Sequence, residues 1–155
     1  MKFLVTGANG FVGKALCTEL VRREQAVRAV QRSAITPVEG VDVAVVDTID
    51  AQTDWTELLR GVEIVIHLAA RVHVMEDTAV DPLAEFLKVN LHGTFNLAQQ
   101  AVRAGIMRLV YASSIKVNGE KTTGSQFFLE SDNPNPRDPY AISKWRAEQE
   151  LHHIA

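Results

Sequence analysis

Residues 2–13 read KFLVTGANGFVG and combine three signals in twelve positions. The apolar run Lys2–Thr6 predicts a strand that is covered on both faces. The amphipathic stretch Phe11–Arg23 predicts a helix. Its expected core stripe consists of Val12, Leu16, Leu20 and Val21. Between strand and helix the spacing G-x-x-G-x-x-G predicts a sharp turn at which backbone groups stay accessible.

Each glycine of this turn has an expected role. Gly7 permits the tight turn, Gly10 lets a pyrophosphate approach the backbone, and Gly13 lets the helix pack closely on the sheet. The free N–H groups and the positive end of the helix then face the phosphates. The predicted phosphate-binding turn also includes Asn9, Phe11 and Val12. A purely structural glycine turn is the alternative, and the position directly after a strand disfavours it.

Strand and helix patterns alternate along the rest of the chain. Further buried strands are predicted at Ala26–Gln31, Val41–Val46, Glu63–Leu68 and Arg108–Ala112, and further helices at Thr53–Arg60, Asp81–Ala104 and Pro139–Ala155. The pattern predicts one α/β domain over residues 1–155, a Rossmann-type doubly wound parallel sheet with strand order 3-2-1-4-5. The segment Asn118–Asp138 lacks periodicity and is expected to be a long loop, either functional or disordered.

Composition excludes several classes of protein. The 155 residues are 46% hydrophobic and 23% charged, as in an ordinary globular domain, and the net charge of −3 disfavours binding to nucleic acid. The single cysteine, Cys17, cannot form an internal disulfide. No apolar run spans a membrane or resembles a signal peptide, so we expect a cytoplasmic enzyme. His67, His73 and His92 lack metal-ligand spacing, and no metal site is predicted.

Six motifs in order along the chain resemble the extended short-chain dehydrogenase/reductase superfamily. They are Thr6-Gly7-x-x-Gly10-x-x-Gly13, Asp47, His67-Leu68-Ala69-Ala70, Asn90-x-x-Gly93-Thr94, Ser113-Ser114 and Pro139-Tyr140-x-x-Ser143-Lys144. Within the superfamily the chain is similar to the NAD-dependent nucleotide-sugar epimerase/dehydratase branch, typified by UDP-glucose 4-epimerase. The resemblance covers the whole chain, and the motifs specify the superfamily more closely than the substrate.

The resemblance implies a bound NAD(P). It assigns Asp47 to the adenine amino group and Asn90 to support of the loop near the nicotinamide and ribose. It also places a segment of small residues along the cofactor, made of Leu68, Ala69 and Ala70. The acidic residue expected after the second strand is missing, and Arg32 stands there instead. A guanidinium can bind the 2′-phosphate of NADP, although Arg32 can equally stack on adenine or lie in solvent. NAD is the expectation, and NADP is the alternative.

Tyr140 and Lys144 lie one helical turn apart, on one face of the predicted last helix. An ammonium beside the phenol, together with an oxidised nicotinamide, is expected to lower the phenol pKa from its ordinary value of about 10. Tyr140 can then exchange a proton with a sugar hydroxyl while hydride moves to or from the nicotinamide. The resemblance favours Ser114 over Ser113 as the group that hydrogen-bonds the same oxygen, and it implies that Lys144 also binds the cofactor ribose.

These assignments predict a UDP-sugar 4-epimerase, which oxidises C4 and reduces it again from the other face. A nucleotide-sugar 4-keto reductase or dehydratase is the alternative. The dehydratase is less favoured because Ile115-Lys116-Val117 stands where that family has an acid pair. Relatives of this kind are longer, so we expect an N-terminal portion that lacks its substrate domain and is inactive alone. A non-catalytic cofactor-binding module is the remaining alternative. The resemblance also implies a homodimer through the last two long helices.

Overall fold

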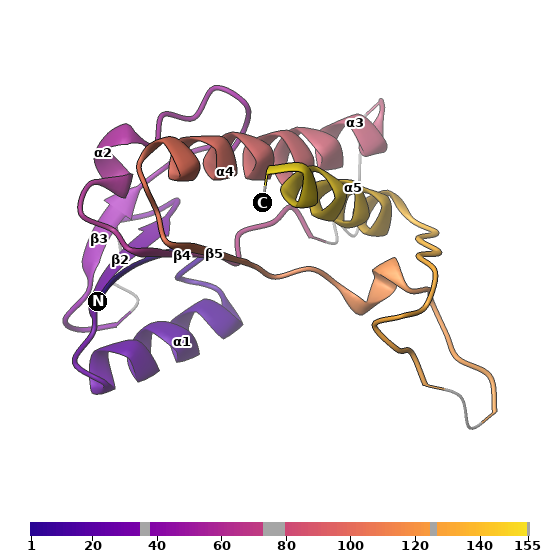
Figure 1. Ribbon diagram of the computed structural model, residues 1–155, viewed down its shortest axis with the longest axis horizontal. Helices are drawn as coiled ribbons and strands as arrows, with labels where there is room; N and C mark the ends of the chain where they lie inside the picture. Colours follow the sequence, from indigo (N-terminus) through magenta and orange to yellow (C-terminus); the bar gives the residue numbers. More distant parts are fainter. Residues whose placement is uncertain (35–37, 73–79, 125–126, 155) are drawn as a thin grey trace.

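The computed structural model describes residues 1–34, 38–72, 80–124 and 127–154. In these ranges five parallel strands form one sheet with the order β3-β2-β1-β4-β5, as predicted (Figure 1). The strands are β1 (Lys2–Thr6), β2 (Ala26–Gln31), β3 (Asp42–Val45), β4 (Ile64–His67) and β5 (Arg108–Tyr111). Successive crossovers place β4 beside β1, so the strand order reverses at β1 and a ligand-binding crevice is expected at the carboxyl ends of these strands.

Helices cover both faces of the sheet (Figure 1). Helix α1 (Phe11–Arg22) lies on one face. The opposite face carries α2 (Thr56–Leu59), α3 (Pro82–Leu87), the π-helical segment η1 (Lys88–Gly93), α4 (Thr94–Arg103) and α5 (Pro139–Ile154). Helix α5 packs beside α4 and η1. The last helix of the chain therefore covers the same face of the sheet as α4.

Two apolar cores explain why the strands carry nearly unbroken apolar runs. On the side of α1, Phe3 and Val5 pack with Cys17. On the other side, Leu4 packs with Trp55 and Leu97. Because successive side chains of β1 point to opposite faces, both faces of this central strand are buried and neither tolerates a polar alternation. Cys17 is fully buried, and burial raises the pKa of its thiol, as expected of a small core residue.

Two predicted helices differ in detail. Val12 was expected in the core stripe of α1 but is 60% exposed, and Gly13 takes the buried position of the first turn. At Gly13 the helix comes too close to the preceding loop for any larger side chain. The helix predicted at Thr53–Arg60 is confined to α2, because the Asp54 carboxylate accepts a hydrogen bond from the Thr56 N–H and ends the loop there.

The long helix predicted at Asp81–Ala104 begins as expected. The Asp81 side chain caps it by accepting a hydrogen bond from the Ala84 N–H, and Pro82 occupies the first turn. Its middle, however, is the π-helical segment η1. A π-helical turn of this kind frequently marks a functional site. Here the turn contains the buried Asn90.

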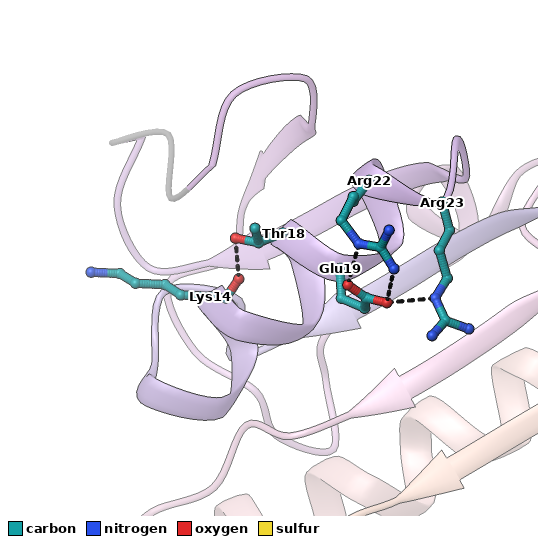
Figure 2. Close-up of polar contacts among 5 residues, drawn as sticks. All are labelled: Lys14, Thr18, Glu19, Arg22 and Arg23. Atoms are coloured by element: carbon teal, nitrogen blue, oxygen red, sulfur yellow. Dashed lines mark hydrogen bonds and ion pairs between the residues drawn. The ribbon is translucent and has the colours of Figure 1, made fainter.

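The outward face of α1 is a solvated surface (Figure 2). Glu19 pairs with Arg22 at 2.7 Å and with Arg23 at 2.6 Å, and the Thr18 hydroxyl donates to the Lys14 carbonyl. The two guanidinium groups lower the pKa of Glu19 to about 2. Exposed pairs of this kind contribute little to stability. In the part of the chain that the structure describes, no helix is both long and apolar enough to cross a bilayer.

Candidate active site

The glycine turn forms the entrance to α1. Gly7 has a φ of +68°, which glycine adopts without strain, and the Gly10 N–H donates to the Gly7 carbonyl at 3.0 Å. A Cβ on Gly13 would lie 2.2 Å from that same carbonyl oxygen. A Cβ on Gly7 would lie 2.9 Å from the Ala69 nitrogen, after β4. The turn is therefore packed against both the helix and the neighbouring strand end, and only glycine fits at positions 7 and 13.

The N-terminus of α1 is open to an anion. Gly10 occupies the cap position without any side-chain cap, and the first turn contains no acidic residue. Phe11 is 95% exposed, and Asn9 is also exposed. The backbone N–H groups of the first turn and the positive end of the helix dipole thus face solvent beside the glycine cradle. A pyrophosphate fits this combination.

A buried histidine ties the ends of β1 and β4 to α4. The Nδ1 atom of His67 lies 2.6 Å from Thr6 Oγ1, and its Nε2 atom lies 3.0 Å from Thr94 Oγ1. The Thr6 hydroxyl oxygen also accepts from the Ala69 N–H at 3.1 Å. Burial, with a smaller contribution from Lys144, lowers the pKa of His67 to about 3, so the ring is neutral. His67 is therefore a hydrogen-bonded core residue.

Asn90 joins the loop after β4 to α5. Its side-chain oxygen accepts from the Arg71 N–H at 2.8 Å, and its amide group donates to the Arg71 carbonyl at 3.0 Å. The same amide group donates to Ser143 Oγ at 2.9 Å. Asn90 therefore fixes the backbone of the loop that begins with Leu68, Ala69 and Ala70.

Helix α5 presents the tyrosine and the lysine of the last motif. Lys144 is only 2% exposed, and its Nζ lies 4.1 Å above the centre of the Tyr111 ring on β5. Burial lowers the pKa of Lys144 to about 8, and the nearby Glu148 carboxylate opposes that shift. Tyr140 is half-buried and packs edge-on against Phe86 of α3, with ring centres 6.2 Å apart.

The turn after β5 is tied to the start of α5. Ser114 accepts a hydrogen bond from the Lys116 N–H at 3.3 Å, in the short 3-10 turn Ile115–Val117. The Lys116 ammonium lies 2.5 Å from Asp138 Oδ2, and Asp138 Oδ1 accepts from the Ala141 N–H at 2.7 Å. The ion pair thus connects the serine turn to the cap of the helix that carries Tyr140. A cavity of about 460 Å³ opens beside Ser113 and Ser114.

The sequence does not predict this ion pair. The two residues are 22 positions apart on either side of the loop Asn118–Asp138, and no local pattern signals such a contact. That loop is irregular in its described residues, as predicted.

The opposite end of the same sheet edge holds Asp47, which the resemblance assigns to the adenine amino group, and Arg32, the candidate for the 2′-phosphate of NADP. Arg32 follows β2, Asp47 follows β3, and both are exposed. The Val46 N–H donates to the Gln31 carbonyl at 2.9 Å, so the two strand ends run side by side. Of the histidines, His67 lies on β4 and His92 on η1, while His73 lies outside the described residues. No group of three or more possible metal ligands gathers among the residues described.

A family model described as the NAD dependent epimerase/dehydratase family matches residues 3–155. A UDP-glucose 4-epimerase from Vibrio cholerae is 42% identical over 96% of this chain and 45% of its own length. A dTDP-glucose 4,6-dehydratase from Mycobacterium tuberculosis is 32% identical over 93% of this chain and 46% of its own length. The chain therefore spans less than half the length of these curated relatives.

Solved structures also match this chain over about half of their own length. MoeE5 in complex with UDP-glucose and NAD is 32% identical and superposes with a TM-score of 0.84 over 99% of this chain and 49% of its own. A UDP-glucuronic acid 4-epimerase from Bacillus cereus, in complex with UDP-glucuronic acid and NAD, is 26% identical with a TM-score of 0.82. That match covers 99% of this chain and 52% of the epimerase.

The glycine turn predicts unequal effects of two alanine substitutions. Gly13→Ala forces a Cβ into the Gly7 carbonyl, and we expect it to lower the free energy of unfolding by about 1–3 kcal/mol. Gly10→Ala places its Cβ at 3.2 Å from that oxygen, on a φ of −74° that any residue adopts. It should change stability by less than about 1 kcal/mol. Urea unfolding of both variants measures this, and equal losses would refute the close packing of Gly13.

The neutral, buried His67 predicts loss of stability in acid. Its pKa of about 3 in the folded state lies below the ordinary value of about 6.5 in the unfolded chain, so protons bind preferentially to the unfolded chain. The contribution of His67 is fully present above about pH 6.5 and is lost as the pH falls toward about 3, at up to about 1.4 kcal/mol per pH unit. Urea unfolding at several pH values between about 7 and 5 should show a shallower slope for His67→Gln.

The exposed His92 of η1 supplies the control for this experiment. His92→Gln should leave the pH slope of the unfolding free energy as it is in the unaltered chain. Parallel curves for the unaltered chain and His67→Gln would show that His67 does not stay neutral in the fold.

Proposed function

The chain belongs to the NAD dependent epimerase/dehydratase family, and from this membership we propose that residues 1–155 are the NAD-binding domain of a nucleotide-sugar 4-epimerase. The observation that carries the proposal is the convergence on one sheet edge of an uncapped glycine turn, Ser114 and the buried Lys144. The 42% identity with a UDP-glucose 4-epimerase supports a UDP-sugar as the substrate. Because the chain covers under half of that relative, the activity is proposed for a longer protein that contains this chain.

NAD is the cofactor that the family description names and that both cited structures contain. The glycine cradle and the open N-terminus of α1 would hold its pyrophosphate. Asp47 would bind the adenine amino group, and the backbone of Leu68–Ala70 would lie along the cofactor. Arg32 is exposed at the end of β2 and suits a 2′-phosphate as well, so NADP is the alternative cofactor.

When bound, NAD would supply the hydride chemistry needed to oxidise C4 of the sugar and reduce it again from the opposite face. The protein would supply the proton transfer. Tyr140 would take the proton of the C4 hydroxyl and give it back, while Ser114 would hydrogen-bond the same oxygen. The Lys144 ammonium would favour the tyrosinate by its charge and would bind the cofactor ribose. Burial strengthens this electrostatic effect because it excludes water from the lysine.

The ion pair between Lys116 and Asp138 favours an epimerase or a 4-keto reductase over a dehydratase. Elimination across the sugar needs an additional acid and base near its C5 and C6 atoms, and the dehydratase pattern supplies these directly after the serine. Here that position holds a cation, and its Asp138 partner already accepts hydrogen bonds from Lys116 and from the start of α5. This chain thus offers no free acid pair at that position.

We also propose that the protein forms a homodimer along α4 and α5, as the family resemblance implies.

Removal of one hydroxyl tests the catalytic assignment. In a full-length protein that contains this chain, we expect Tyr140→Phe to keep NAD binding, because the ring and its packing against Phe86 remain. Turnover of UDP-glucose should fall by about 10²–10⁴-fold, the usual effect of losing a positioned acid–base group. Calorimetry measures NAD binding, and chromatography of the nucleotide sugars measures product.

Two comparison variants make this experiment decisive. Thr18→Ala removes an exposed hydroxyl on the far face of α1 and should keep full turnover. Lys144→Ala should weaken both NAD binding and turnover. Undiminished turnover by Tyr140→Phe would remove Tyr140 from the mechanism. A 4,6-keto product in place of the C4 epimer would replace the epimerase with a dehydratase.

A further inference from the structure

Tyr111 stands between the buried histidine and the buried lysine of the site. Its ring stacks on His67, with ring centres 5.9 Å apart and planes inclined by 25°. The Lys144 Nζ lies over the ring, 4.1 Å from its centre. The three side chains come from β4, β5 and α5, so the aromatic ring connects two sheet strands to the helix that carries Tyr140.

The Lys144 ammonium has no hydrogen bond or ion pair with another side chain in the part of the chain that the structure describes. A buried ammonium without a partner is unfavourable, because it loses its hydration. The face of an aromatic ring carries partial negative charge and attracts a cation within about 6 Å of the ring centre. In the described residues the Tyr111 ring is thus the group that contacts this charge directly, while Glu148 on the same helix favours it through its carboxylate.

We propose that Tyr111 is a positioning residue that holds the protonated Lys144 through the face of its ring. The inference rests on the proposed function, in which the charge of Lys144 favours the tyrosinate of Tyr140. The role belongs to the ring and not to the hydroxyl. The Tyr111 oxygen is buried and has no hydrogen-bond partner among the described residues, so its removal costs no contact.

The electrostatic surroundings of Lys144 make the ring important. Glu148, one turn further along α5, raises the pKa of the lysine, while burial lowers that pKa to about 8. His67 on β4 is neutral, and burial raises the pKa of the Tyr111 phenol, so that it is neutral too. Tyr140 lies on the same helix, Lys116 of the 3-10 turn is paired with Asp138, and Lys88 and His92 of η1 are exposed. Loss of the ring face would leave burial opposed mainly by Glu148.

A pKa of about 8 leaves this lysine mostly protonated at neutral pH, but with little margin. A further decrease of the Lys144 pKa by about one unit would change the side chain from mostly protonated to mostly neutral at about pH 7.5. The positive charge that the proposed mechanism needs would then be absent from most molecules. The identity of the residue at position 111 would thereby set the pH range in which Tyr140 can act.

The test is an NMR titration of Lys144 in the chain without cofactor or substrate. Carbon-13-labelled lysine reports the protonation of each side chain, and Lys144→Arg assigns the Lys144 signal. We expect Tyr111→Phe to titrate as the unaltered chain does, because the ring face remains. Tyr111→Leu should lower the protonation constant of Lys144 by about threefold or more, since a cation–π contact in a desolvated site is lost.

A third variant separates the ring face from packing. A trifluorinated phenylalanine placed at position 111 keeps the shape of the ring and weakens its negative face. It should lower the Lys144 pKa below that of Tyr111→Phe, whereas a purely structural role for the ring predicts no difference between the two. This variant distinguishes an electrostatic role of the ring from a packing role even where Tyr111→Leu fails to fold.

An unchanged Lys144 pKa in the fluorinated variant would overturn the proposal, and so would equal decreases in Tyr111→Phe and Tyr111→Leu. Neither result depends on epimerase activity, because no substrate is present. Conversely, a protein that binds NAD but does not epimerise UDP-glucose would contradict the proposed function and leave the contact between Tyr111 and Lys144 intact.

Discussion

The hydrogen bonds through the buried His67 are the constraint on which the rest of the site depends. They connect Thr6 at the end of β1 with Thr94 at the start of α4, and the Thr6 hydroxyl oxygen also holds the Ala69 N–H. These contacts press the loop after β4 against the glycine turn, where a single added carbon on Gly7 would collide with Ala69. Because the ring is neutral, the network adds no buried charge next to Lys144.

From this fixed point the two halves of the site extend in opposite directions along the carboxyl edge of the sheet. Toward β2 and β3 lie the open end of α1, Arg32 and Asp47, which suit the phosphates and the adenosine of a dinucleotide. Toward β5 lie Ser114 and Tyr111, with α5 packed above them. Asn90 links the halves by bonding the backbone of Arg71 and the side chain of Ser143. The arrangement of the site is thus set mainly by where the backbone of these strand ends and loops lies.

The sequence predicted the strand order and the glycine turn because both follow from local rules: apolar runs of strand length, a spacing of glycines, and short right-handed crossovers. It did not predict the exposure of Val12, the π-helical turn around Asn90 or the ion pair of Lys116 with Asp138. Each of these depends on which surfaces meet after folding. The contact of Tyr111 with Lys144 joins a strand residue outside the six motifs to the lysine of the last motif, and such a strand residue gives no local sign of its partner.

The central claim is that one edge of the sheet binds the whole length of a nicotinamide dinucleotide. The most direct measurement is the change in backbone amide NMR shifts when NAD⁺ is added to the nitrogen-15-labelled chain. The account predicts the largest changes at residues 8–13, with further changes at 68–71, 111–114 and 140–144, and none on the outward face of α1 around Glu19. Binding without changes in the glycine turn, or changes centred on that outward face, would contradict it.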